Sequence, residues 1–266
     1  EHTVSYKLLP RHSLRMLPRA SAGDLFMSLR SDPLWRDGKA AHPSLAWGLT
    51  YLLGAVHLAD QPGEEPLLSQ FWASSRATEG RLLTDFLGML HHQRQLHPGL
   101  RVYYFGAPVM AALQQLASAH GVGEAFLTDL QREGVFIDLS EVLRRSMRLS
   151  EGTRALTAIE PLYAQGLGPD PDIPVTAFAD VVEAEKEGRA EQAEAMRAAL
   201  TRSLYRTGLS LSQLRAWLLG LAGRSVDDEL VQPAPLADLN ELLVQAGRAE
   251  DETDTERVLR QLLEPL

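Results

Sequence analysis

The sequence predicts an α/β fold, a five-stranded mixed sheet flanked by helices and followed by a helical C-terminal extension. Three observations predict it. Apolar, strand-like runs separated by turn residues fill the first third, strand-like and helical segments then alternate, and helical periodicity dominates after Ser140. The 266 residues, 45% of them hydrophobic, suffice for one large domain or two small ones with a buried core.

The first third predicts three antiparallel strands. A short apolar run at Asp24–Arg30 follows the loop-forming residues 20–23, and strand formers are concentrated in Leu45–His57 and Leu67–Ala73. The segments between these runs contain Asp-Pro, Asp-Gly and Pro-Gly pairs, which are strong turn formers. Strands joined by such links indicate a meander.

The middle of the chain predicts parallel strands separated by helices. Apolar residues at three- and four-residue spacing indicate a helix over Thr78–Leu96, and Arg101–Phe105 is a compact strand. Helices are expected over Pro108–His120 and Gly123–Arg132, before a strand at Val135–Leu139. Such strand–helix–strand connections join parallel neighbours.

The remainder predicts helices only. They are expected over Glu141–Leu149, Thr153–Glu160, Ala177–Gly188, Ala190–Arg206, Leu209–Leu221, Leu236–Gln245 and Thr253–Leu263. A meander, a helix, two parallel strands and a helical cap are the element order of the ribonuclease H-like fold. The expected division is an N-terminal linker or extension over 1–20, the α/β domain over 21–224 and a helical extension over 225–266.

Composition excludes several classes of function. The formal charge of −9 argues against bulk electrostatic attraction to nucleic acid, and the lack of cysteine excludes disulfides, thiolate metal sites and a cysteine nucleophile. No apolar run is long enough to span a bilayer, and residues 1–20 lack a signal-peptide core, so the cytoplasm is the expected location and no membrane partner is expected. The chain starts at Glu1 without an initiator methionine, so we expect either a domain cut from a longer protein or a processed product, and the first is favoured.

An ordered set of short motifs runs through most of the chain. It comprises Gly23–Phe26, Ser31–Leu34, Gly48–Gly54, Phe71–Ala73, Val102–Tyr103, Gly134–Leu139 and Ile159–Tyr163. Over about residues 8–223 the chain thereby resembles the YprB-type ribonuclease H-like domains of the DEDD 3′–5′ exonuclease superfamily. Such domains often accompany RecB-like nuclease or helicase domains, so the resemblance implies nucleic-acid processing, DNA repair and partner domains in one longer chain.

The resemblance also implies where catalytic acids would lie. Two divalent metals about 3.5–4 Å apart would be held by carboxylates. The first strand's acid pair falls on Ser28 and Arg30, and the acid after the fourth strand falls on Val109. The acid of the late helix falls near Arg206 and Thr207. An arginine where two dications should bind opposes metal binding, which predicts a pseudo-nuclease without catalytic residues, metal ligands or cofactor.

Two acids near the other motifs are retained, Asp138 and Glu160. A structural role is favoured for both, Asp138 as a cap for the following helix and Glu160 as a solvated helix residue. The alternative from the enzyme class is an active exonuclease in which Asp32, Asp138 and Glu160 form a rearranged acid set for Mg²⁺ or Mn²⁺.

Arginines offer the candidate contacts to DNA or RNA. Arg144, Arg145 and Arg148 lie along one predicted helix, Arg154 follows, and Arg30 stands at the vestigial site. The favoured reading of the Arg144–Arg154 strip is a solvated face with salt bridges. A third alternative for the whole chain is therefore a protein-interaction module with no nucleic-acid role.

Overall fold

The structure is a computed structural model that describes residues 4–9, 14–36, 47–58, 65–150, 155–171 and 173–231. Its centre is a five-stranded mixed sheet in the order β4-β3-β2-β5-β6. The strands are β2 (Leu25–Arg36), β3 (Trp47–His57), β4 (Leu67–Trp72), β5 (Val102–Tyr104) and β6 (Phe136–Asp138). The sequence prediction of five strands in a mixed sheet is confirmed.

The pairing directions also agree with expectation. β2, β3 and β4 form an antiparallel meander, and β5 and β6 run parallel beside β2. β2 extends six residues beyond the predicted strand end at Arg30, and its pairing with β3 is irregular between Arg30 and Ser31 and again between Asp32 and Arg36. The irregularity follows Arg30, so it bends the strand just past the predicted site.

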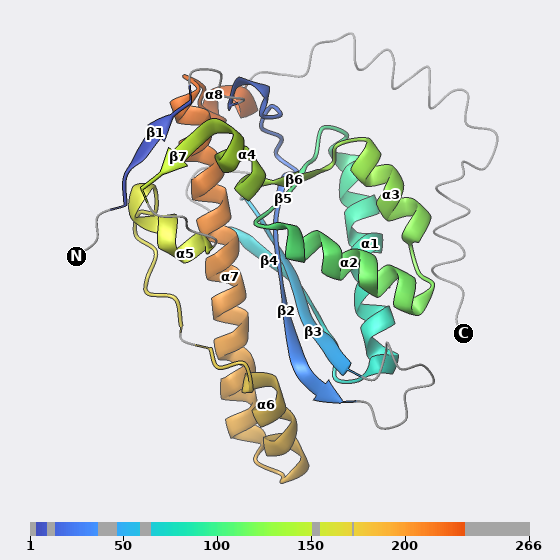
Figure 1. Ribbon diagram of the computed structural model, residues 1–266. Coiled ribbons are helices and arrows are strands. Elements are labelled where there is room, and N and C mark those ends of the chain that lie inside the picture. Colours follow the sequence, from blue (N-terminus) through green and yellow to red (C-terminus); the bar gives the residue numbers. More distant parts are fainter. Residues whose placement is uncertain are drawn as a thin grey trace, which may run out of the picture.

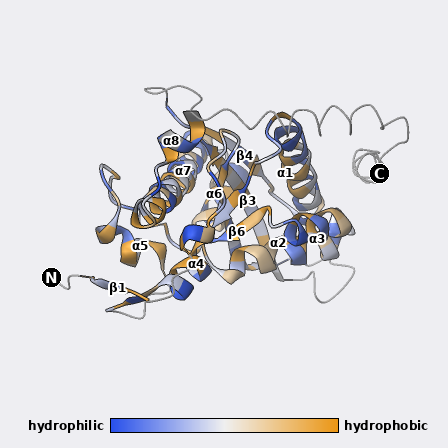
Figure 2. Ribbon diagram, turned by 90° about the horizontal axis from the view of Figure 1, so that it is seen from above, coloured by the Kyte–Doolittle hydropathy of each residue, from blue (hydrophilic) through white to orange (hydrophobic). Residues whose placement is uncertain are grey.

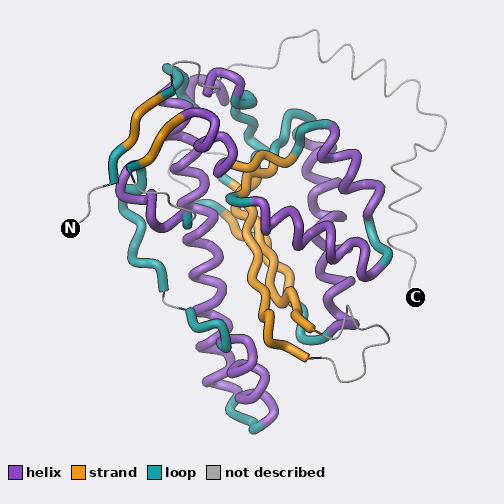
Figure 3. The backbone as a smooth tube through the Cα atoms, in the orientation of Figure 1, coloured by secondary structure: helices purple, strands orange, loops and turns teal. Residues whose placement is uncertain are grey.

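Helices cover both faces of the sheet (Figures 1 and 3). One face carries α1 (Arg76–Leu96), α2 (Ala107–His120) and α3 (Glu124–Arg132). The other carries α4 (Leu139–Ser146), α6 (Ala177–Lys186) and α7 (Ala190–Leu221). Seen from above in Figure 2, the two groups stand on opposite sides of the strands, and most helices show hydrophilic and hydrophobic residues on different sides.

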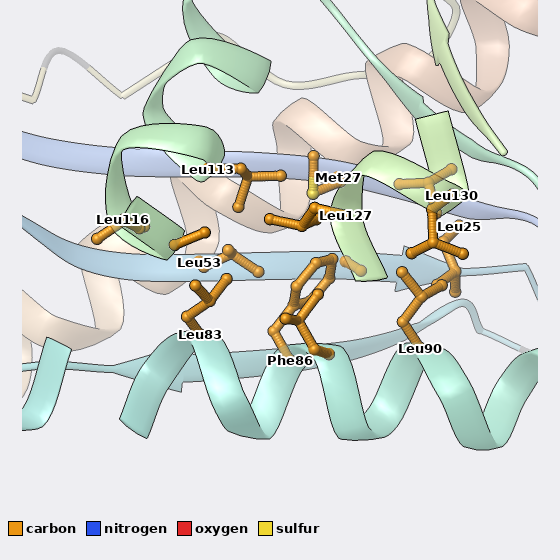
Figure 4. Close-up of a cluster of buried hydrophobic side chains, with 14 of the residues drawn as sticks. Leu25, Met27, Leu53, Leu83, Phe86, Leu90, Leu113, Leu116, Leu127 and Leu130 are labelled. Atoms are coloured by element: carbon orange, nitrogen blue, oxygen red, sulfur yellow. The ribbon is translucent and has the colours of Figure 1, made fainter. Parts of the chain in front are cut away.

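The core is divided by the sheet. Leu25 and Met27 of β2 pack with Leu53 of β3 and with α1, α2 and α3, whose leucines and Phe86 converge in Figure 4. Phe26, the residue between them, points to the opposite face and packs with Tyr103 and α7. Because strand side chains alternate, β2 is buried on both faces at its N-terminal half.

The prediction of two helices after Ala190 is wrong, because α7 is one helix of 32 residues. The predicted break at Gly208 is a packing contact. A Cβ on Gly208 would lie 2.3 Å from Val56 Cγ2 and 3.3 Å from the Phe26 carbonyl oxygen. Gly54 of β3 is similarly close to Leu204. The glycines let α7 approach the sheet closely, which stabilises the helix through tertiary contact.

The segment after Ser140 departs from the predicted helix. α4 ends at Ser146, and β7 (Met147–Leu149) pairs antiparallel with β1 (Tyr6–Leu8). A strand partner 140 residues away leaves no local sequence signal. Of the predicted helix Thr153–Glu160, the described part contains α5 (Leu156–Ile159), which passes into a 3₁₀ turn, η3 (Glu160–Leu162), because Pro161 cannot continue an α-helical hydrogen-bond ladder.

The N-terminal segment, expected as a linker or extension, packs on the domain where it is described. Leu14, in the 3₁₀ turn η1 (Leu14–Met16), and Leu17 are buried in the core on the α7 side. After α7 the chain continues into α8 (Val226–Val231), and the Glu229 carboxylate accepts a hydrogen bond from the Ala20 backbone N–H at 2.6 Å. The predicted helices Leu236–Gln245 and Thr253–Leu263 lie outside the described residues.

Candidate functional site

Arg30 and Thr207, two of the four predicted site positions, are in direct contact. Arg30 points from β2 toward α7, and its Nη2 donates hydrogen bonds to Ser203 Oγ at 3.1 Å and Thr207 Oγ1 at 3.0 Å. Ser203 and Thr207 are one helical turn apart on α7, so one planar guanidinium reaches both hydroxyls. This cluster joins residues more than 170 positions apart.

The electrostatics of this cluster are those of a shielded cation. Burial lowers the pKa of Arg30, while Tyr51 and the carboxylate of Asp170 oppose that shift. Asp170 also accepts a hydrogen bond from Ser203 Oγ at 3.5 Å. Arginine remains charged under such shifts. The positive charge therefore stays at this position and repels any divalent cation placed beside it.

The remaining two predicted positions differ in placement. Ser28 is buried on β2, two residues from Arg30 and hence on the same strand face, opposite Gly54 of β3. Val109 does not join the others. It lies in the first turn of α2 and packs against the core cluster on the α1 side of the sheet. Val109 therefore packs on the other side of the sheet from the contact between Arg30 and Thr207.

Asp138 is held as a helix cap. It stands at the end of β6, and its Oδ1 accepts hydrogen bonds from the backbone N–H groups of Ser140 and Gly106, both at 2.9 Å. The carboxylate thus begins α4 and ties β6 to the turn that follows β5. Its charge contributes, after burial, to raising the pKa of Tyr104 to about 12.

Glu160 is an ion-paired anchor for α7. Arg206 donates Nη1 and Nη2 to its two carboxylate oxygens at 2.9 and 2.7 Å, and Ser210 donates its hydroxyl at 2.7 Å. Burial raises the pKa of Glu160, but these hydrogen bonds and the charge of Arg206 outweigh burial and hold the pKa below its ordinary value. The sequence expectation of a solvated helix residue is therefore wrong for Glu160, which is buried in a short 3₁₀ turn.

The rearranged acid set does not form one site. Asp32 is buried at the irregular part of β2 and accepts hydrogen bonds from the backbone N–H groups of Leu34 and Trp35. Asp138 and Glu160 have the separate partners given above. In the described ranges, no three His, Cys, Asp or Glu side chains are grouped so that they could hold a metal ion.

The arginine strip is partly neutralised. Arg144 and Arg145 are exposed on α4, and both pair with Glu141 at 2.6 and 2.5 Å. The hydrogen bond from Arg144 is the main cause that lowers the pKa of Glu141. Arg148 is exposed on β7 beside β1, and Arg154 lies outside the described residues. Two arginines sharing one glutamate leave a net positive charge on this face.

The sequence reasoning missed a buried ionic cluster beside a cavity of about 130 Å³. Glu79 is 1% exposed, and its carboxylate accepts hydrogen bonds from the Thr50 backbone N–H at 2.6 Å and from Arg76, with His120 Nε2 at 2.9 Å. Glu79 occupies the apolar face of α1, in step with Leu82, Leu83 and Phe86. An acidic residue at the helical spacing of the buried apolar residues was the sequence signal that could have indicated a buried ion pair. Both carboxylate oxygens of Glu79 are thus engaged within the protein. Because their partners come from α1, α2 and β3, the cluster joins these three elements.

A second missed cluster lies at the other end of β2. Asp24 and Arg215 are fully buried and ion-paired, and Asp24 also accepts hydrogen bonds from the Ser21 and Arg101 backbone N–H groups at 2.9 Å. The Arg215 guanidinium lies 5.0 Å from the Tyr103 ring centroid. These contacts bind α7 to the start of the sheet.

Comparison with protein families, with curated proteins and with solved structures finds no match for this chain. Within the part of the chain that the structure describes, none of the helices combines the length and apolarity needed to cross a bilayer.

Proposed function

We propose that this chain is a catalytically degenerate ribonuclease H-like domain that positions nucleic acid or partner domains within a larger nuclease- or helicase-type protein. The observation that carries the proposal is the contact of Arg30 with Ser203 and Thr207. The resemblance places metal-binding acids at Arg30 and near Thr207, and these two positions touch across β2 and α7. Contact between these two positions supports the proposal, because a nuclease site whose acids were replaced by a cation and hydroxyls would bring them together.

The arrangement of the sheet supports the same proposal. The resemblance implies a meander followed by two parallel strands, and the order β4-β3-β2-β5-β6 has this form. The ribonuclease H-like identity of the fold is part of the proposal, as are the 21–224 domain bounds and a cytoplasmic location.

Charge explains why this site would not hydrolyse phosphodiesters through two metals. Ser28, Arg30, Ser203 and Thr207 offer hydroxyls and one cation, and Asp170 adds a single carboxylate. Mg²⁺ and Mn²⁺ require several carboxylate oxygens. The cation would also occupy the region where negative ligands must gather. We therefore expect no cofactor, and we assign to the domain a scaffolding role.

A nuclease assay tests the proposal. Single- and double-stranded DNA and RNA are incubated with the protein in Mg²⁺ or Mn²⁺, beside a known metal-dependent exonuclease as positive control. We expect no cleavage by the chain. If Asp138→Ala abolishes cleavage while the control Asp129→Ala, whose side chain is 50% exposed, keeps it, the active exonuclease with the rearranged acids would be established instead.

Binding of the same DNA and RNA substrates, first at low salt, tests whether the domain positions nucleic acid. If the domain positions nucleic acid, binding weakens as salt rises and the Arg144→Ala/Arg145→Ala double variant binds less than Arg81→Ala/Arg132→Ala, which removes two exposed arginines elsewhere. Absence of binding at low salt would leave the protein-interaction module, without a nucleic-acid role.

A further inference from the structure

β4 forms one edge of the sheet, and just before this strand the Tyr205 hydroxyl of α7 donates a hydrogen bond to the Pro66 carbonyl at 3.0 Å. β4 pairs with β3 along its whole length, from Leu67 to Trp72, and no described strand lies on its other side. The start of β4 is exposed, Leu67 having 71% of its surface accessible. An edge of this kind presents backbone donors and acceptors in a row.

The backbone groups that face outward follow from the antiparallel alternation. The Ala73 N–H donates to the Tyr51 carbonyl at 2.9 Å, so Ala73 and every second residue before it direct their backbone groups toward β3. Leu68, Gln70 and Trp72 therefore direct theirs away from β3. These three residues form the available hydrogen-bonding edge.

Within its own described residues, Leu67–Trp72, β4 carries none of the sequence features that usually block strand addition. The strand LLSQFW contains no charged residue and no proline, and no irregularity interrupts its pairing with β3. The opposite edge of the sheet is different, because β6 is only three residues long and ends in the charged, capping Asp138. Strand pairing is thus blocked at one edge and permitted at the other.

Charges flank the β4 edge with opposite sign. Glu65 is exposed just before β4, and the Arg197 guanidinium lies 4.9 Å from the Trp72 ring centroid at the far end. Arg197 is about a quarter exposed and also pairs with Glu185. Two antiparallel copies of the edge would bring Glu65 of each copy toward Arg197 of the other, whose charge is shared with Glu185.

We propose that β4 pairs with β4 of a second copy of this chain, antiparallel about a twofold axis at Gln70. Gln70 then faces Gln70 of the second copy, Leu68 faces Trp72, and the backbone groups of all three residues are satisfied. The two sheets become one continuous sheet. Self-pairing of this kind needs only the surface that both copies share.

The register predicts a charge-dependent mixing experiment. Gln70→Lys and Gln70→Glu each place like charges directly opposite each other across the axis, which destabilises strand pairing. We expect the full chain to sediment as a dimer, and each variant alone to dissociate with a dissociation constant raised roughly tenfold. An equal mixture of the two variants should restore dimers, as heterodimers. Gln114→Lys on α2 is the matched control and should leave the dimer intact.

A single engineered cysteine gives a second, independent readout. Because the chain has no cysteine, Gln70→Cys should form a disulfide-linked dimer under mild oxidation, while Leu96→Cys, an exposed position on α1, should not. Circular dichroism checks that each variant is folded.

Three results would contradict the proposed β4 dimer. A wild-type chain that stays monomeric at high micromolar concentration overturns the proposal, and so does a dimer that Gln70→Lys and Gln70→Glu leave unchanged. A folded Gln70→Cys protein that forms no more cross-link than Leu96→Cys also counts against it.

Discussion

Arg30 is the residue whose environment most constrains the chemistry of this molecule. Its guanidinium is partly buried and donates hydrogen bonds to two hydroxyls of α7. The Leu29 carbonyl accepts a further hydrogen bond from it at 3.2 Å. A partly buried charge is stabilising only where its donors find acceptors, and three acceptors contact the Arg30 guanidinium. The same side chain thus links β2 to α7 and keeps a positive charge at the site.

Replacing Arg30 with methionine should destabilise the fold. Arg30→Met keeps much of the side-chain volume but removes the charged hydrogen bonds to Ser203 and Thr207, so we expect the free energy of unfolding to fall by roughly 1–3 kcal/mol. Arg30→Lys should have an intermediate effect, because one ammonium group cannot reproduce the planar fork. Urea denaturation at pH 7 measures the free energy of unfolding of wild type, Arg30→Met and Arg30→Lys.

Arg81→Met is the matched control for that series. The Arg81 side chain is 82% exposed and lies 3.6 Å from Asp85, so its loss should change the free energy of unfolding by about 0.5 kcal/mol or less. Equal destabilisation by Arg30→Met and Arg81→Met would show that the Arg30 contacts contribute nothing specific.

At the scale of elements, α7 organises one whole side of the molecule. Its glycine-mediated contact with the sheet, its pairing with Asp24 through Arg215 and its pairing with Glu160 through Arg206 act along its length. The Glu160 contact is extended by Ser210, whose hydroxyl lies 2.8 Å from the Tyr163 hydroxyl. Together these contacts attach the α5–η3 segment to the helix.

The Glu160–Arg206 pair predicts a specific dependence of stability on pH. Because the folded-state pKa of Glu160 lies below its ordinary value of 4.5, the pair stabilises the protein above that value, and this contribution is lost as pH falls through the folded-state pKa. Arg206→Gln should therefore be less stable than wild type at pH 7, and the difference should narrow toward pH 3.5. Urea denaturation at several pH values in this range measures the free energy of unfolding of wild type and of Arg206→Gln.

Arg81→Gln serves as the control for the pH series, since its ion pair with Asp85 is exposed and contributes little. A difference between wild type and Arg206→Gln that widens on acidification would contradict the assigned role of Glu160.

At the scale of the whole molecule, residues 17–20 of the N-terminal segment contact the segment that follows α7. Arg224, just after α7, donates to the Leu17 carbonyl at 2.7 Å, and Glu229 of α8 accepts from the Ala20 N–H. Leu14 is buried among α7 residues such as Leu214 and Leu218. The N-terminal segment therefore contributes to the main core.

Shortening Leu14 tests this contribution. Leu14→Ala should lower the free energy of unfolding by about 2–5 kcal/mol, because it leaves a cavity in a fully buried site. Met16→Ala, two residues away and 84% exposed, should change it by about 0.5 kcal/mol or less. Thermal and urea denaturation compare the variants, and a Leu14→Ala protein as stable as Met16→Ala would mean that the segment is dispensable.

The strands and most helices could be predicted from local patterns. Apolar runs, turn residues and helical spacing report which face of an element is buried, and they placed β2 to β6 and α1 to α3 to within a few residues, apart from the extension of β2 past Arg30. The β1–β7 pair and the unbroken α7 were missed, because both depend on contacts between distant segments.

The sequence by itself determined which side chains stand at the predicted site, since the absence of carboxylates at Ser28, Arg30 and Thr207 is a matter of residue identity. Only the tertiary structure decided which of these residues meet. It joined Arg30 to Thr207, placed Val109 on the opposite face, and buried Glu79 and Glu160 with their own cationic partners. The physical reason is that chemistry belongs to single residues, whereas burial and pairing arise when segments far apart in sequence pack together.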